Sequence, residues 1–281
     1  MRITCVVDNN TGSPDPARAV HKARGSLLSE HGLSLLIETD AGRKVLLDTG
    51  STERAFANNL QCLGLKPSDL DAVFISHGHY DHLGALPLLI REGVTCHTHP
   101  LTFKGDRYHS SSGHLRFIGA SKELLRMLED HPPICSSQPH ELVPGVRTTG
   151  EVLRSTSFEV PQHFVIERDG KASPDLIMEE QGLCVSTAQG TAVLTGCGHA
   201  GIVNIVSQVR SQGDEAIRMV MGGFHLMGSS PEVLQRTVEG LHRLGVENVA
   251  PMHCTGFPAT KLFADSFPGF VYFGTGCYID L

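Results

Sequence analysis

Short apolar runs alternate along the chain with longer segments whose apolar residues recur at helical spacing. In the first half, the runs have the length and branched-residue content of buried strands. They predict strands at 2–7, 33–38, 44–48, 72–76 and 95–99. The segment ERAFANNLQCLG (53–64) has apolar residues at helical spacing and ends on Gly64, which predicts a helix with a glycine stop. This alternation is typical of a layered α/β protein.

The second half repeats the pattern. It predicts a hairpin-like pair of strands at 183–187 and 191–196, helices at 201–213 and 230–245, and strands at 216–224 and 246–252. Ser230 and Pro231 mark the start of the second helix and Gly245 its end. Two similar halves packed face to face would form a four-layer αββα sandwich, although the pattern alone also fits a doubly wound sheet.

Residues 101–145 depart from this pattern. The segment begins with the polar LTFKGDRYHSSSGHLRF and continues with the proline-rich LEDHPPICSSQPHELVPG. We expect an irregular insertion over the mouth of an active site, with a mobile surface loop of no function as the alternative. The length of 281 residues fits one large domain, so a single domain over 1–281 is expected.

Composition narrows the class of protein. The chain is 40% hydrophobic and 19% charged, which is typical of a globular protein. Its formal net charge of −7, without any lysine- or arginine-rich run, argues against nucleic-acid binding. The eight cysteines are scattered and predict no disulfide framework. No apolar run approaches the length of a membrane span and no signal peptide is evident, so we expect a cytoplasmic protein without membrane association; the oligomeric state stays open.

The stretch ISHGHYDHLGAL follows the end of a predicted strand and gathers three histidines and an aspartate. Gly78 separates His77 from His79, so both imidazoles can point toward one site. Asp81 and His82 then open a predicted helix, DHLGALPLLIRE, whose leucines would pack on the sheet. Imidazole and carboxylate ligands suit zinc, manganese or iron. One metal could bind His77 and His79, and a second metal could bind Asp81 and His82.

The segment SHGHYDH resembles the HxHxDH signature of the metallo-β-lactamase superfamily, and VLLDTG (45–50) resembles the aspartate motif that precedes it there. Three further segments extend the similarity to one branch, which contains the dihydropterin ribofuranosyl-aminobenzene phosphate synthases and related metal-dependent hydrolases. They are VLTGCGHAGIVNI (193–205), GGFHL (222–226) and PMHCTG (251–256). The resemblance covers nearly the whole chain and implies the αββα sandwich, with the site at one edge of the two sheets.

The resemblance also implies two divalent metal ions, with zinc expected and manganese, magnesium and iron as alternatives. The first histidine pair of the cluster would belong to one metal, and Asp81 and His82 to the other. His253 matches the final histidine of the family and would complete the second site. Asp48 would orient ligands through hydrogen bonds, with a solvated turn aspartate as the alternative.

The match is imperfect where most of the superfamily has an aspartate that bridges the two metals. The equivalent loop, TGCGHAG, offers Cys197 and His199 instead. His199 is the expected ligand, because it follows a strand in the same set of edge loops. Cys197 is either a thiolate ligand or a small apolar core residue. The intermediate histidine of many relatives has no evident counterpart; His97, His99 and His163 are candidates, each with another role as the alternative.

Two residues are expected to act in catalysis. Asp81 would bind metal and accept a proton from metal-bound water. His225 follows a predicted strand and two glycines, and it would contact the substrate or donate a proton to the leaving group. Lys104, Arg107 and His109 are candidate contacts for an anionic substrate, with a solvated surface as the alternative.

Three functions fit these residues. The first is an enzyme that joins a dihydropterin diphosphate to a ribofuranosyl-aminobenzene phosphate with loss of pyrophosphate. The second is a metal-dependent hydrolase of phosphoesters, phosphodiesters or lactones, in which water is the nucleophile. The third is a non-catalytic metal- or pterin-binding protein, which the intact HxHxDH signature makes the weakest of the three.

Overall fold

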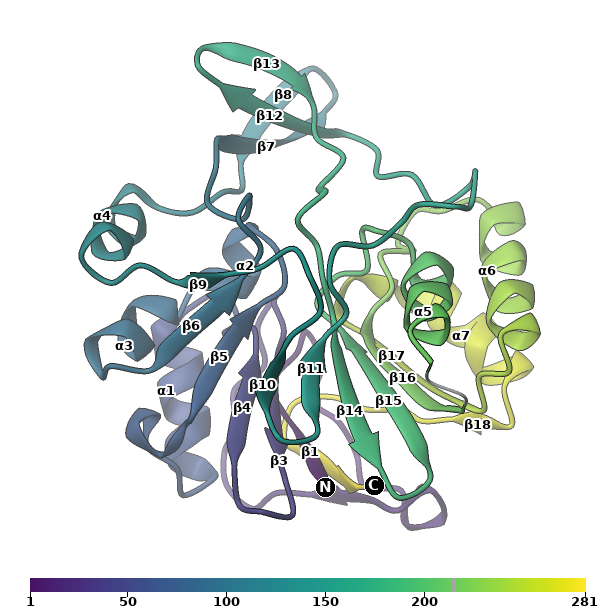
Figure 1. Cartoon of the computed structure of the whole chain (residues 1–281). Helices are drawn as coiled ribbons and strands as arrows, with labels where there is room; N and C mark the ends of the chain where they lie inside the picture. Colours follow the sequence, from purple (N-terminus) through teal and green to yellow (C-terminus); the bar gives the residue numbers. More distant parts are fainter. Residues whose placement is uncertain (214–215) are drawn as a thin grey trace.

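Two central β-sheets pack face to face in the computed structural model, which describes residues 1–213 and 216–281 (Figure 1). The first sheet contains, in spatial order, β2 (Val20–Lys22), β19 (Cys277–Asp280), β1 (Arg2–Val7), β3 (Ser34–Glu38), β4 (Lys44–Leu47), β5 (Ala72–Ile75), β6 (Thr95–Thr98) and β9 (Ile134–Cys135). The second contains β10 (Glu141–Val143), β11 (Val146–Thr148), β14 (Leu183–Thr187), β15 (Gly190–Thr195), β16 (Ile217–Gly223), β17 (Asn248–Met252) and β18 (Gly269–Phe270).

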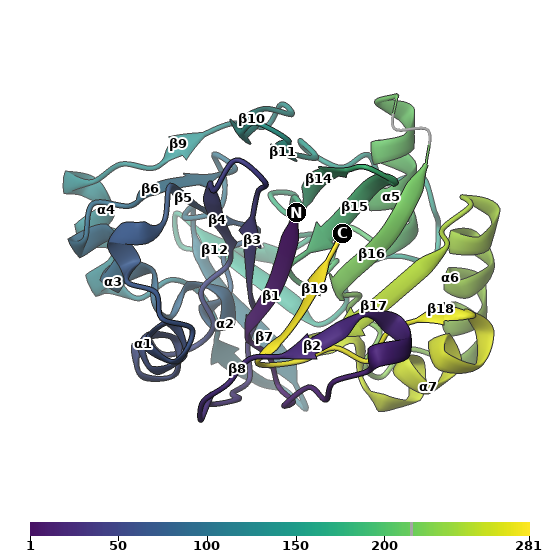
Figure 2. The ribbon, with the colours of Figure 1, turned by 90° about the horizontal axis from the view of Figure 1, so that it is seen from below.

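Helices cover the outer face of each sheet, as the view from below also shows (Figure 2). The first sheet carries α1 (Glu53–Cys62), α3 (Leu86–Arg91) and α4 (Lys122–Asp130); the second carries α5 (Ile202–Ser211), α6 (Pro231–Arg243) and α7 (Phe257–Ser266). Short helical turns lie at α2 (Tyr80–Leu83), η1 (Pro16–Arg18), η2 (Pro67–Asp69) and η3 (His253–Thr255). The predicted four-layer αββα sandwich is confirmed. None of the helices in the described ranges has the length and apolarity needed to cross a bilayer.

Strands that are apolar on both faces explain the layering. Ile3, Leu35 and Leu47 point into the core between the two sheets. Their neighbours Leu36 and Leu46 point to the other side and pack against the helices of the first sheet. Successive strand residues face opposite sides, so a continuous apolar run is what a sheet covered on both faces requires.

The helix predicted over DHLGALPLLIRE is in fact two helices, α2 and α3. The break falls at Gly84, where the chain passes the backbone of Ser51 so closely that a Cβ atom would lie 2.0 Å from the Ser51 carbonyl. Pro87 then occupies the first turn of α3, where its missing N–H costs no hydrogen bond. The sequence prediction was therefore wrong about one continuous helix here.

Residues 101–145 are also more regular than expected. They contain α4, β9 and β10 together with a hairpin of β7 (Asp106–Ser111) and β8 (His114–Phe117). The hairpin turns at Ser112 and Gly113, whose φ angles of 49° and 80° suit a tight two-residue turn. It joins β12 (Phe164–Arg168) and β13 (Lys171–Pro174) in an antiparallel sheet of order β13-β12-β7-β8. This cap sheet stands above the two central sheets in Figure 1.

Candidate metal centre

Parallel strands bring the candidate ligand loops to one edge of the sandwich. In the first sheet β4 and β5 run parallel, and in the second β15, β16 and β17 do. Asp48 and His77 follow the first two strands closely, and Cys197, His225 and His253 follow the other three. The carboxyl ends of parallel strands meet at one edge of a sheet, so these loops converge there.

Three buried histidines form the first group of candidate ligands. One ring nitrogen from each of His77, His79 and His199 lies within 4.8 Å of the others. Burial is the main reason why the pKa of each of these histidines lies well below its usual range, so the rings are neutral. Among the described residues, the Nε2 of His79 and both ring nitrogens of His199 have no hydrogen-bond partner. Buried nitrogens normally have one, and a metal ion would supply it.

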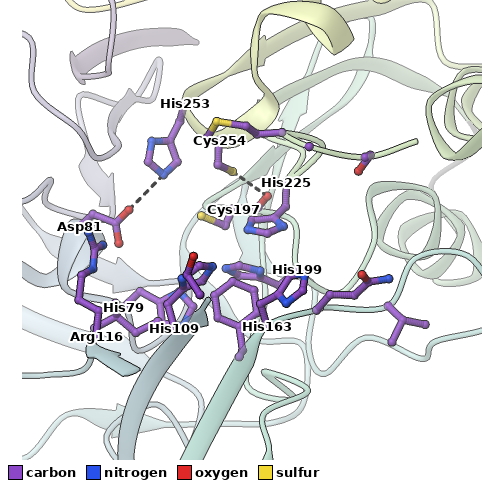
Figure 3. A pocket seen from close by; sticks show the side chains of 18 of the residues that line it. His79, Asp81, His109, Arg116, His163, Cys197, His199, His225, His253 and Cys254 are labelled. Atoms are coloured by element: carbon purple, nitrogen blue, oxygen red, sulfur yellow. Dashed lines mark hydrogen bonds and ion pairs between the residues drawn. The ribbon is translucent and has the colours of Figure 1, made fainter. Parts of the chain in front are cut away.

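Asp81, His253 and His31 form a neighbouring second group. The Oδ2 of Asp81 lies 3.4 Å from the Nε2 of His253 and 3.0 Å from the Nε2 of His31. Between the two groups, the Nε2 of His82 lies 3.2 Å from the Sγ of Cys197. The thiol of Cys197 thus faces candidate ligands, and Figure 3 shows it beside His253 and His199. Sequence reasoning missed His31, which no motif surrounds.

Residues of both groups line one cavity of about 970 Å³, a volume suited to a small organic substrate or a pair of them. Phe164 of the cap sheet lies over the histidines, with ring centroids 5.3 Å from His79 and 5.0 Å from His199. His225 also lines the cavity, and its ring centroid lies 4.1 Å from that of His199. Burial, assisted by nearby His253, lowers the pKa of His225 to about 4, so it presents a neutral imidazole.

Comparison with known proteins places this geometry in a family. Residues 30–169 match the metallo-beta-lactamase superfamily. The chain is 30% identical over 255 residues to the 7,8-dihydropterin-6-methyl-4-(beta-D-ribofuranosyl)-aminobenzene-5'-phosphate synthase of Methanocaldococcus jannaschii, with 85% of each chain covered. The chain belongs to the metallo-beta-lactamase superfamily.

Two further relatives agree with this membership. The uncharacterized protein MJ0448 of the same archaeon is 31% identical over 255 residues, which cover 90% of this chain and 94% of that protein. Tm1679, whose crystal structure is described as a metal-dependent hydrolase of the beta-lactamase superfamily, is 31% identical with a TM-score of 0.84. That match covers 100% of this chain and 99% of the other. The chain is therefore a metal-dependent enzyme of the metallo-beta-lactamase superfamily, and its imidazole, carboxylate and thiol groups suit a divalent metal.

The structure gathers all six metal ligands that the sequence predicts into these two groups and the space between them. They are His77, His79, Asp81, His82, His199 and His253. The alternatives for the intermediate histidine do not join them. The Nδ1 of His97 instead faces His140 at 3.3 Å, and His99 bonds to Glu151 at 3.1 Å. His163 lines the cavity but belongs to neither group.

Asp48 is buried and holds His82 in place. Its Oδ2 accepts a hydrogen bond from the Nδ1 of His82 at 2.7 Å, and its Oδ1 accepts one from the backbone N–H of Ser76 at 2.8 Å. Burial lowers the pKa of His82, but the carboxylates of Asp48 and Asp81 outweigh it and raise that pKa to about 9. Gly196 packs against this group so tightly that a Cβ would lie 2.0 Å from the Ser76 Oγ. These bonds fit the orienting role expected of Asp48.

Glu180 supports the loop that carries Cys197 and His199, and sequence reasoning missed it. Its carboxylate is fully buried and accepts three backbone N–H bonds, from Cys197 at 3.1 Å, Gly198 at 2.6 Å and Ala200 at 2.7 Å. Burial raises the pKa of Glu180 to about 7, against the lowering effect of these N–H groups. One side chain thus fixes the backbone on both sides of His199.

Replacing Glu180 with glutamine should weaken metal binding by roughly tenfold, because the amide NH2 would face a backbone N–H and loosen the loop. A competition titration with a chelator measures the affinity. Glu159→Gln is the matched control: Glu159 is also buried and accepts the N–H groups of Val203 and Asn204 in α5, at 2.8 and 3.0 Å. Equal metal affinity in the two variants would show that Glu180 supports the fold only.

The three predicted substrate contacts lie in different surroundings. Lys104 is exposed and does not line the cavity. Arg107 is 1% exposed and pairs with Asp175 and, at 2.9 Å, with Glu179, so the expectation that it contacts substrate was wrong. Its positive charge is neutralised by these two buried carboxylates, which lie beneath the loop of His77 and His79. His109 lines the cavity.

Proposed function

We propose that the enzyme binds two divalent metal ions and acts on a phosphate- or pyrophosphate-bearing small molecule. In its most specific form, the proposal is the condensation of a dihydropterin diphosphate with a ribofuranosyl-aminobenzene phosphate. The observation that carries it is the pair of adjoining ligand groups that face one cavity. The named activity of the 30% identical M. jannaschii synthase supports the choice of substrates.

His77, His79 and His199 would hold one metal, and Asp81, His82 and His253 the other. Cys197, whose Sγ lies 3.2 Å from the Nε2 of His82, would contribute a thiolate. When bound, such metals neutralise a diphosphate leaving group or lower the pKa of a water. In the condensation, the bond from the pterin methylene carbon to the diphosphate oxygen breaks, and a bond to the aminobenzene partner forms. Asp81 would accept the proton that the nucleophile releases, and His225 would contact the departing group; both residues line the cavity.

A hydrolase is the second candidate, because Tm1679 is 31% identical over the whole chain and is described as a metal-dependent hydrolase. The same residues serve this reaction if water replaces the aminobenzene partner as nucleophile. The phosphoester, phosphodiester or lactone bond then breaks, and the water proton passes to Asp81. The two candidates differ in which nucleophile the cavity admits.

The test is to incubate the metal-loaded protein with two substrates in parallel. A dihydropterin methyl diphosphate with the aminobenzene partner reports pyrophosphate release, and bis(p-nitrophenyl) phosphate reports nitrophenol release. We expect partner-dependent pyrophosphate release, and elemental analysis should find two metal equivalents. Nitrophenol release alone would select the hydrolase. Absence of both, combined with tight pterin binding, would contradict catalysis and favour a binding protein.

A further inference from the structure

The cap sheet presents a row of side chains to the cavity. His109 in β7 lies directly opposite Arg116 in β8 on one side and opposite Phe164 in β12 on the other. Residues directly opposite one another in antiparallel strands project from the same face of a sheet. All three line the cavity. The row therefore runs from the candidate metal ligands, which Phe164 contacts, outward to a guanidinium.

His163 adds a second imidazole beside this row. It immediately precedes β12, its ring centroid lies 6.4 Å from that of His109, and its side chain lines the cavity. Its backbone has a φ of 67°, the left-handed region that a non-glycine residue seldom adopts. Figure 3 shows His109, His163 and Arg116 on the same side of the cavity as His79.

This part of the wall carries uncompensated positive charge. Among the described residues that line the cavity, Asp81 is the one acid, and His31 and His253 already contact its carboxylate. Arg116 is exposed, and within residues 1–213 and 216–281 it forms no ion pair with a carboxylate. Its Nη2 donates to the hydroxyl of Tyr80 at 3.2 Å, which leaves the other guanidinium N–H groups free. A guanidinium with free N–H groups and two adjacent imidazoles match the oxygens of a phosphate.

We propose that Arg116, His109 and His163 form an anion subsite that binds a second phosphate of the substrate, apart from the group that reacts at the metal ligands. This inference rests on the proposed function and gives that site a substrate class: organic phosphates with one anionic group at the reacting end and another at the cap sheet. The apolar part of the cavity wall, with Phe158, Val160, Met227 and Val233, suits the organic portion between them.

The experiment compares methyl phosphate with bisphosphates of straight-chain diols of increasing length, by calorimetric titration of the metal-loaded enzyme. We expect the unsubstituted enzyme to bind at least one bisphosphate roughly tenfold more tightly than methyl phosphate. Arg116→Gln should abolish this gain without changing the affinity for methyl phosphate. Arg116→Lys should keep part of it, because a charge remains but paired N–H donation is lost.

Arg126→Gln is the matched control, since Arg126 is also exposed but lies on α4 and outside the cavity lining. It should keep the full gain. The inference is overturned if no bisphosphate gains over methyl phosphate in the natural sequence, or if the gain survives Arg116→Gln. The proposed function is judged separately, by pyrophosphate release and metal content. If the protein binds two metals and turns over substrate but shows no Arg116-dependent gain in affinity, the proposed function stands and the subsite proposal fails.

Discussion

Replacing His79 with alanine is expected to remove most of the bound metal and to lower turnover by about 100-fold or more, while the protein still unfolds cooperatively. The Nε2 of His79 is buried and has no hydrogen-bond partner among the described residues, so its removal breaks no protein contact at that atom. The ring also borders the cavity, and water can occupy the space it leaves. Elemental analysis measures the metal, and a thermal melt measures the cooperativity.

The control for this variant is His131→Ala. His131 is exposed at the end of α4 and does not line the cavity, so both metal content and turnover should stay at the level of the natural sequence. If the His79 variant retained its full metal stoichiometry, the assignment of the three-histidine group would be wrong. If it lost metal and also lost its cooperative transition, His79 would have a structural role that its unpartnered nitrogen does not indicate.

The cluster from His77 to His82 could be predicted from sequence because its geometry is local. A strand ends, one glycine separates two histidines, and the next turn begins a helix, so few conformations are available to the ligands. His199 and His253 carry no such local signal. Their places follow from the parallel order of β15, β16 and β17, a long-range property that only the family resemblance supplied.

The cap sheet shows why local patterns fail elsewhere. Its hairpin was detectable, since SSSGH carries the glycine of a tight turn, but its strands are too polar to resemble buried ones. One of the two residues that lie opposite His109 is Phe164, which belongs to a different segment of the chain. Arg107 was misassigned for the same reason: its ion-pair partners Asp175 and Glu179 are distant in sequence, so it looked like a free surface charge.

Glu180 was missed because a buried carboxylate resembles a solvated one in sequence. Nothing in EEQG shows that both glutamates are buried or that they have different partners: Glu179 pairs with Arg107, and Glu180 accepts the N–H groups of the ligand loop. Burial of a charge is stable only where the fold supplies hydrogen bonds to it. Those hydrogen bonds depend on the position of the loop after β15 in the folded chain, so the role of Glu180 follows from tertiary structure alone.

Asp48→Asn is expected to weaken metal binding by about 10- to 100-fold with little change in the backbone. Asp48 has a φ of 59°, and asparagine tolerates this left-handed conformation about as well as aspartate, so the substitution tests the carboxylate rather than the turn. The carboxylate accepts hydrogen bonds at both oxygens. An amide has one oxygen, so its NH2 must face either the backbone N–H of Ser76 or the Nδ1 of His82.

Either arrangement disturbs His82. If the NH2 faces the imidazole, the Nδ1 of His82 must act as an acceptor, so the ring can keep a proton only at Nε2, the nitrogen that lies 3.2 Å from Cys197 and would bind metal. If the NH2 faces Ser76 instead, the end of β5 loses a buried hydrogen bond and the loop that follows is loosened. Both outcomes reduce metal affinity, and a chelator competition titration measures the loss.

A matched variant separates this effect from a general loss of stability. Asp71→Asn removes a carboxylate that accepts the backbone N–H of Lys44 at 2.7 Å and pairs with Arg43, at the opposite end of β4 from Asp48. It should lower the free energy of unfolding without changing metal affinity. With cobalt as a probe, the Asp48 variant should also show an altered visible absorption spectrum, because the orientation of one imidazole ligand changes. Unchanged affinity and an unchanged spectrum would mean that His82 needs no help from Asp48 to present its Nε2.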